Sequence, residues 1–294
     1  MKMGIVTPVL HMNPRFDPPG WEETGSVEDV VAVVAAAERA GVDWVACSEH
    51  IGIPESASGI RGGRYFDPFT TLGFVAAHTE RIGLLTHMTV LPYHHPLEIV
   101  KRLGTLDLLS HGRVILGVGV GSLQPEFELL GHEFEGRGER SDDAIRAIRA
   151  AWGIRVPAYE GDHYKFSGFI VEPSGLPRPV KVWVGGRTRR SLRRAVELGH
   201  AWMPFRLELD ELTAMLDEQS IRDLIARRDE PLDMIFAPEP PADPLGDPEA
   251  TRRTFRSYAQ AGATGLSMRF RHESRSHYVE QMEAAVALVS GLDA

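Results

Sequence analysis

Apolar residues along the chain fall into short runs that are separated by longer amphipathic segments. The runs are rich in Val, Ile, Leu and Trp, and they are too short for helices, as is typical of buried strands. They predict eight strands, at residues 2–7, 42–47, 82–87, 113–118, 180–184, 201–203, 232–237 and 265–269.

The segments between these strands show helical spacing. Ser26 has Asp29 three residues later, which is the spacing of a capping box, and Gly41 ends the helix that follows. Another helix begins at Pro96, a position that the first helical turn tolerates. Further helices are predicted at residues 141–152, 189–198, 207–228, 248–261 and 276–290. Residues 155–179 form an insertion with two short strand-like runs.

Strands that alternate with helices predict a parallel sheet, because parallel neighbours need a crossover helix. Eight such units in 294 residues favour a closed (β/α)₈ TIM barrel of the α/β class over an open, doubly wound sheet. No linker divides the chain, so we expect one domain over residues 1–294, with the insertion between strands four and five. The Pro-rich run at residues 238–248 is interpreted as the loop after the seventh strand.

Composition excludes several classes of protein. Hydrophobic residues make up 43% and charged residues 25% of the chain, as in globular proteins. The longest apolar run, residues 30–37, is too short to span a bilayer, and a net charge of −9 argues against a nucleic-acid partner. Cys47 is the one cysteine, and the first residues do not resemble a signal peptide. We therefore expect a cytoplasmic protein with no membrane partner.

A glycine pair ends the fifth predicted strand, and a helix begins directly after it. Gly185, Gly186, Arg187 and Thr188 precede this helix, whose free amides and dipole would attract an anion such as a phosphate. The alternative is a tight turn without a ligand. Five arginines crowd the same stretch: Arg187, Arg189, Arg190, Arg193 and Arg194. They form either a solvated helix face or a site for a phosphorylated ligand that carries further negative charge.

Other polar residues follow the second, third and fourth strands, where barrel enzymes place their active sites. Glu49 and His50 offer an acceptor and a titratable imidazole, although a histidine at a strand end is often structural. The glycines of residues 117–122 lack dinucleotide-binding spacing. These glycines either leave room for a flat ligand or reduce the crowding of side chains inside the barrel. His94 and His95 are adjacent and diverge, so no metal site is predicted. Catalysis would then depend on a cofactor.

Five segments carry a family resemblance. They are GVDWVACSEH (41–50), ERIGLLTHMTVLPYHHP (80–96), TLDLLSHGRVILGVGVGSLQPEFELLG (105–131), AIRAIRAAW (144–152) and VKVWVGGRTRRSLRRAVELGHAW (180–202). Together they resemble the luciferase-like monooxygenase superfamily, and within it the branch that uses the deazaflavin coenzyme F420. The resemblance implies a (β/α)₈ barrel with the cofactor at its carboxyl-terminal mouth, and commonly a homodimer formed through helices near strands two to four.

The resemblance also implies roles for individual residues. Glu49 matches an acidic residue that contacts the deazaflavin ring, and His50 matches an active-site acid or base. His87 and Met88 match a cis peptide behind the ring. Gly119 and Val120 match backbone contacts to the ring, and Gly185, Gly186, Arg187 and Thr188 match the phosphate-binding turn. One departure is Ser122, where relatives that oxidise a sugar phosphate carry a glutamate. Glu126, one turn onward, is not expected to replace it.

These features favour an F420-dependent oxidoreductase that exchanges a hydride between the deazaflavin C5 and a small organic substrate. An FMN-dependent monooxygenase on the same barrel is the alternative, and the arginines favour F420, whose tail carries extra carboxylates. A cofactor-binding protein without turnover and a metal-dependent hydrolase are further alternatives. The loops at residues 11–24 and 51–66 contribute Trp21, Tyr65 and Phe66, which predict a partly aromatic substrate pocket.

Overall fold

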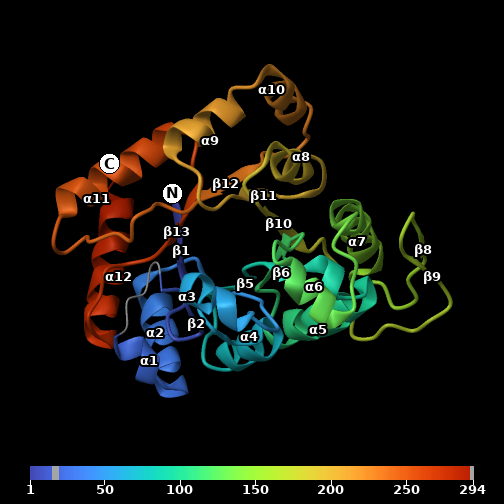
Figure 1. Ribbon diagram of the computed structural model, residues 1–294, viewed down its shortest axis with the longest axis horizontal. Coiled ribbons are helices and arrows are strands. Elements are labelled where there is room, and N and C mark those ends of the chain that lie inside the picture. The colour runs from blue at the N-terminus through green and yellow to red at the C-terminus, as the bar shows by residue number, and fades with distance from the viewer. Residues whose placement is uncertain (15–19, 292–294) are drawn as a thin grey trace.

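Eight parallel strands form a closed barrel in the computed structural model, which describes residues 1–14 and 20–291 (Figure 1). The strands are β1 (Lys2–Val6), β3 (Trp44–Cys47), β5 (Gly83–Thr86), β7 (Val114–Gly119), β10 (Lys181–Gly185), β11 (Ala201–Met203), β12 (Asp233–Phe236) and β13 (Gly265–Met268). They pair in this order, and β10 also pairs with β7, which closes the barrel. The predicted TIM barrel is confirmed, and the open sheet is wrong.

Helices surround the barrel. The longer ones are α2 (Val27–Ala40), α4 (Pro68–Ala76), α5 (Pro96–Leu109), α7 (Arg137–Ala151), α8 (Arg189–Leu198), α11 (Pro248–Gln260) and α12 (Arg275–Ser290). Ser26 and Asp29 form the predicted capping box, and Gly41 closes α2 in the left-handed conformation. None of the helices in the described ranges is long and apolar enough to cross a membrane.

Two helix predictions need correction. The single helix expected at 207–228 is two helices, α9 (Leu209–Leu216) and α10 (Gln219–Ala226). The break occurs because Asp217 ends α9 and Glu218 has an extended ψ of 126° that starts α10 afresh. Helix α7 begins at Arg137 rather than at residue 141, directly after Gly136 in the left-handed conformation.

The barrel interior is filled by its own small cluster of side chains. Trp44 and Trp183 meet edge to face inside it, with ring centroids 4.9 Å apart. Gly4 on β1 faces Trp44, and a Cβ at that glycine would lie only 2.0 Å from the indole Cε2. A packed interior of this kind leaves the strand ends, rather than the barrel axis, as the place for chemistry.

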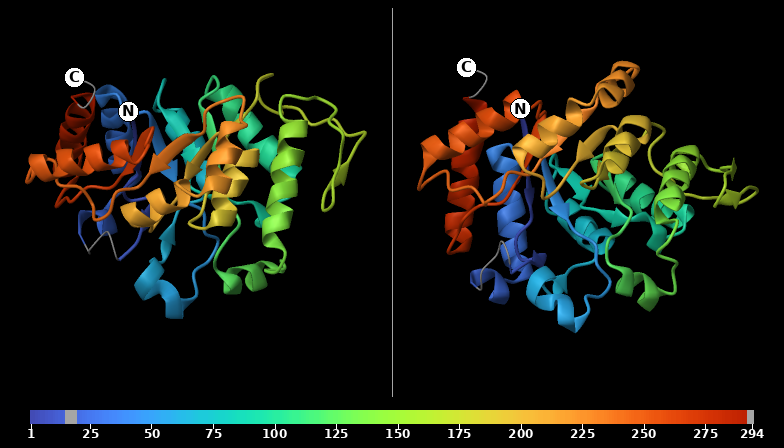
Figure 2. Two further views of the ribbon diagram at one scale, coloured as in Figure 1. Left: turned by 90° about the horizontal axis from the view of Figure 1, so that it is seen from above. Right: turned by 45° about the horizontal axis from the view of Figure 1, so that its top comes forward.

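Two additions extend the barrel. The insertion carries β8 (Tyr159–Glu160) and β9 (Lys165–Phe166), an antiparallel hairpin that projects beside α7 (Figure 2). The loops after β1 and β3 meet in a second antiparallel pair, β2 (His11–Met12) with β4 (Arg64–Tyr65). The two predicted substrate loops are therefore joined, although residues 15–19 of the first lie outside the described residues.

Candidate active site

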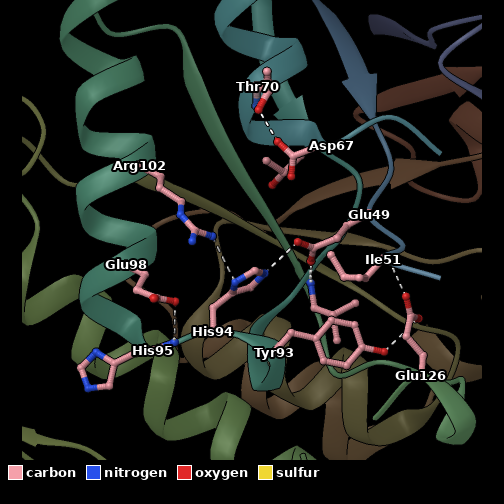
Figure 3. Close-up of polar contacts among 12 residues, drawn as sticks. Glu49, Ile51, Asp67, Thr70, Tyr93, His94, His95, Glu98, Arg102 and Glu126 are labelled. Carbon is pink, nitrogen blue, oxygen red and sulfur yellow. Dashed lines mark hydrogen bonds and ion pairs between the residues drawn. The ribbon is translucent and has the colours of Figure 1, made fainter. Parts of the chain in front are cut away.

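Glu49 and His50 follow β3 at the carboxyl-terminal mouth of the barrel, but they enter separate networks. The Glu49 carboxylate is buried, and it accepts hydrogen bonds from the Val90 backbone N–H at 2.6 Å and from His94 Nε2 at 2.7 Å (Figure 3). On the other side of the His94 ring, Arg102 lies 3.4 Å from Nδ1. Both oxygens of Glu49 thus have partners within the protein.

His50 has a carboxylate partner of its own. Its Nδ1 lies 2.7 Å from Oε2 of Glu126, and the His50 side chain keeps 19% of its surface exposed. Because a carboxylate accepts, Nδ1 carries the proton toward Glu126, and in the neutral ring Nε2 is the atom that can take up a proton. The Tyr65 ring meets the His50 ring at 4.6 Å between centroids. This arrangement is suited to general acid–base chemistry at Nε2.

Glu126 is a functional candidate that the sequence analysis gave no role. It lies on α6 (Gln124–Leu130), and its side chain is fully buried. One oxygen accepts from the backbone N–H groups of Ile51 and Gly52 at 2.5 and 3.1 Å, and the other also accepts from the Tyr93 hydroxyl at 3.0 Å. Burial alone would raise the pKa of Glu126, but these donors and His50 outweigh it and hold the pKa below its ordinary value. Glu126 is therefore an ionised partner for His50.

The His87–Met88 peptide bond is cis, as the resemblance implied. The Met88 side chain fills the barrel mouth against the glycines at the ends of two strands. A Cβ at Gly117 would lie 2.9 Å from Met88 Sδ, and one at Gly185 would lie 2.7 Å from Met88 Cγ. Gly119 lies 3.2 Å from Met88 Cβ by the same measure. These glycines leave room for the Met88 side chain. This favours the interpretation that they relieve crowding inside the barrel over the interpretation that they leave room for a flat ligand.

The predicted anion turn lies between β10 and α8. Gly186 has a φ of 120°, a conformation that side chains rarely adopt. Thr188 caps α8 by accepting from the Ser191 N–H at 3.2 Å, and both Thr188 and Arg187 are exposed. The turn therefore presents the start of a ten-residue helix to solvent at the barrel mouth.

Three of the five clustered arginines are engaged by carboxylates of neighbouring helices. Arg189 pairs with Glu218, Arg190 with Glu139, and Arg194 with Asp142. Arg187 lies over the Phe205 ring at 5.9 Å. Only Arg194 is buried among them, but neighbouring carboxylates offset the charge of all three, so the cluster supports a highly charged ligand less than the sequence suggested.

Unpartnered polar atoms gather at the same mouth. Buried side-chain atoms without a hydrogen-bond partner occur on His11, His87, Thr89 and Ser267. Burial and Arg269 lower the pKa of His87 to about 4, so its ring is neutral at pH 7. Buried polar atoms of this kind call for a ligand with polar edges. Together with the turn at the start of α8, they fit an aromatic cofactor with a phosphorylated tail.

Comparison with known proteins identifies the family of this barrel. A family model described as luciferase-like monooxygenase matches residues 1–290. An F420-dependent glucose-6-phosphate dehydrogenase of Amycolatopsis mediterranei is 31% identical over 163 residues, 54% of this chain and 48% of that protein. An FMNH₂-dependent dimethylsulfone monooxygenase of Pseudomonas fluorescens is 27% identical over 145 residues, 48% and 39% of the two chains. The chain thus spans about half the length of such curated relatives.

The solved structure of the monooxygenase RslO1 from Streptomyces bottropensis has the same fold. It superposes over 100% of both chains with a TM-score of 0.74 and 21% sequence identity. The same fold occurs in an F420-dependent secondary alcohol dehydrogenase in complex with an F420–acetone adduct, with a TM-score of 0.76 and 14% identity. It also occurs in the oxygenating constituent of 3,6-diketocamphane monooxygenase from Pseudomonas putida in complex with FMN, with a TM-score of 0.73 and 15% identity.

Proposed function

The chain belongs to the luciferase-like monooxygenase family, and we propose that it is an F420-dependent oxidoreductase acting on a small organic substrate. When bound, the deazaflavin would exchange a hydride at C5 with a carbon of the substrate. The protein's own residues would bind the cofactor, orient the substrate and move the accompanying proton.

The His50–Glu126 pair is the observation that carries this proposal. Hydride exchange at a carbonyl or alcohol carbon requires a proton to be given to, or taken from, the oxygen on that carbon. His50 Nε2 is suited to this task because Nδ1 is fixed at 2.7 Å from the Glu126 carboxylate. The buried negative charge of Glu126 stabilises the imidazolium that forms when Nε2 takes up the proton.

The residues that would hold the cofactor lie on three strand ends. The backbone at Gly119 and Val120 and the cis peptide of His87 and Met88 would lie against the ring. The turn at Gly185, Gly186, Arg187 and Thr188 would hold the phosphate through free amides, the Thr188 hydroxyl and one cation. Glu49 matches a residue that contacts the ring in the family, but here both of its oxygens are already hydrogen-bonded.

An FMN-dependent monooxygenase is the second candidate function. It is favoured by the pairing of Arg189, Arg190 and Arg194 with carboxylates, which leaves fewer cations for the carboxylate-rich tail of F420. FMN carries a single phosphate and would need only the turn before α8.

A parallel titration with F420 and with FMN, followed by ring fluorescence, tests the proposal. We expect F420 to bind, and a carbonyl or alcohol substrate to change its absorbance. Tight binding of FMN with none of F420 would reverse the order of the two candidates. Binding of F420 without any substrate-dependent change in absorbance would indicate a protein without turnover.

Replacing Arg187 and Thr188 together by Ala tests the anion turn. We expect cofactor affinity to fall by about 10²- to 10⁴-fold, because two charge-assisted hydrogen bonds are lost and each is worth about 1.5–3 kcal/mol. Arg193→Ala is the matched control, since Arg193 is an exposed arginine of the same cluster that follows the turn. If the double variant and Arg193→Ala bind the cofactor with equal affinity, the turn does not hold the phosphate.

We also propose a homodimer formed through the helices near strands two to four. Helices α4 and α5 expose Phe74, Leu108 and Leu109 by 40, 41 and 70%, and exposed apolar side chains of this size favour an interface. Light scattering on the wild type and on Leu109→Asp would measure it. The cytoplasmic location stays a prediction from the single cysteine.

A further inference from the structure

The β2–β4 pair brings His11 to the same aromatic ring that contacts His50. His11 pairs with Tyr65 in the register of these strands, and the two rings stack with centroids 5.8 Å apart and planes 22° apart. The Tyr65 ring also meets the His50 ring, with centroids 4.6 Å apart. The mouth therefore holds two imidazoles around one tyrosine.

The tautomer of His11 follows from its contact with Arg269. The guanidinium nitrogen of Arg269 lies 2.7 Å from His11 Nε2. A guanidinium only donates hydrogen bonds, so Nε2 must accept and cannot carry a proton. Burial and the nearby Arg269 lower the pKa of His11, so the ring is neutral at pH 7 and its one proton is on Nδ1.

The Nδ1–H group of His11 is a buried donor with no acceptor among the residues that the structure describes. The whole residue is only 5% exposed, and Nδ1 has no hydrogen-bond partner. Leaving a buried N–H group without an acceptor is costly, so such a group in a ligand site indicates an acceptor on the ligand. The two ring nitrogens point in nearly opposite directions, and Nδ1 therefore faces away from Arg269.

We propose that His11 Nδ1–H donates a hydrogen bond to an uncharged oxygen of the substrate, so that the substrates are ketones, aldehydes or alcohols with an apolar body. The proposal rests on the proposed function, in which the same oxygen exchanges a proton with His50. A carbonyl oxygen has two lone pairs, so one can accept from His11 Nδ1–H and the other can take the proton from Nε2 of a protonated His50 ring. His11 orients the oxygen, because a neutral imidazole N–H is too weak an acid to release its proton, and His50 with Glu126 moves the proton. The Tyr65 ring, which contacts both imidazoles, supplies an apolar wall.

Isosteric probes test the oxygen itself. Acetophenone and cyclohexanone each have an oxygen-free counterpart of nearly the same shape, α-methylstyrene and methylenecyclohexane. We expect at least one of the two ketones to bind the cofactor-loaded protein about tenfold more tightly than its counterpart. Equal binding within both pairs, or no binding of either ketone, would overturn the proposal.

Two substitutions test the roles of the two His11 ring nitrogens separately. An Asn amide takes the place of Nδ1, whereas a Gln amide reaches the place of Nε2. We expect H11Q to keep an acceptor for Arg269 and to lose the preference for the ketone, and H11N to keep part of that preference. Thermal melting identifies a variant that does not fold. If H11Q folds and retains the full tenfold preference, His11 does not bind the oxygen.

Nitrogen-15 chemical shifts of labelled histidine rings provide a readout that does not depend on activity. We expect the His11 signal to show a proton on Nδ1 and to move when the ketone is added. A proton on Nε2 would contradict the argument. A signal that ketone leaves unchanged would also contradict it, and would indicate a water in the small cavity of about 10 Å³ that His11 lines with Thr7 and Arg269.

The proposed function can fail separately from this inference. The ketone titrations are carried out with whichever of F420 and FMN the protein binds, and on the protein alone if it binds neither. Absence of cofactor binding would reject the proposed function and leave the ketone preference measurable.

Discussion

The barrel mouth contains two histidine–glutamate pairs with the same 2.7 Å separation and different capacities. In the His50–Glu126 pair, Nδ1 faces the carboxylate and the side chain is 19% exposed. In the His94–Glu49 pair, Nε2 faces the carboxylate, and the ring is only 8% exposed. Arg102 approaches the remaining nitrogen of His94, and Phe69 packs edge-on against its ring at 5.4 Å.

The difference shows that the chemistry of a histidine–glutamate pair depends on the imidazole nitrogen that does not face the carboxylate. The His50 ring keeps Nε2 for a substrate, whereas both nitrogens of His94 have partners within the protein. Glu49 and His94 therefore fix the segment around Val90, which follows the cis peptide, and His50 and Glu126 are able to move a proton.

The largest effect is expected from His50→Ala. Turnover should fall by about 10²- to 10⁴-fold, because positioned acid–base catalysis contributes that much, while cofactor affinity changes little. The measurements are kcat, from cofactor absorbance, and the cofactor Kd. His94→Ala is the matched control, and its kcat per folded molecule should stay within about threefold of wild type, well below the range for a catalytic histidine. If the kcat of His50→Ala also stays within about threefold of wild type, His50 has no part in the mechanism.

A smaller effect on turnover is expected from Glu126→Gln. The amide keeps an oxygen for the backbone N–H groups of Ile51 and Gly52 but loses the charge beside His50. A charge-assisted hydrogen bond is worth about 1.5–3 kcal/mol, so kcat should fall by about 10- to 100-fold without a change in cofactor affinity. An equal fall in kcat for Glu49→Gln would show that the two pairs do not differ as proposed.

Glu49→Gln should instead act on stability. The amide cannot replace the carboxylate toward both Val90 and His94, so the free energy of unfolding should fall by about 1–3 kcal/mol. Urea denaturation measures this loss, and kcat per folded molecule is the accompanying control. Unchanged stability with weaker cofactor binding would support the family role of Glu49 as a contact to the ring.

The smallest effect is a pH dependence that Glu126 contributes. Its pKa is held below the ordinary value near 4.5, so its stabilising contribution is present above pH 4.5 and is lost as the pH falls through the folded-state pKa. The difference in unfolding free energy between wild type and Glu126→Gln should therefore shrink as the pH drops below 4.5. Urea denaturation between pH 3 and pH 7 tests this, and a constant difference would contradict the ionised state of Glu126.

Much of the fold could be predicted because the signals are local. Alternating apolar runs placed all eight barrel strands, and the helix at 189–198 has the predicted bounds. The capping spacing of Ser26 and Asp29 was sufficient to start α2. The break between α9 and α10 was missed because apolar residues recur on both sides of Glu218 at helical spacing, and only its backbone angle interrupts the helix.

Parts of the candidate site could be predicted from the sequence, and the cis peptide among them is confirmed. The sequence and its resemblance indicated His50, the cis peptide and the turn before α8. They treated Glu49 and His50 as one pair, because the residues are adjacent. The structure separates them, since successive residues at a strand end point in different directions. Each then finds a partner distant in sequence, 76 residues away for His50 and 45 for Glu49.

By itself the sequence determined the order of strands and helices and the closed barrel, and it indicated the end of the barrel at which we propose the site. Those features arise from periodicity, caps and glycines, which act over a few residues. Tertiary structure decided which carboxylate each histidine meets, why Gly185 faces Met88, and which nitrogen of His11 carries its proton. Such contacts form only when closure of the barrel brings distant strand ends together, so no local pattern specifies them.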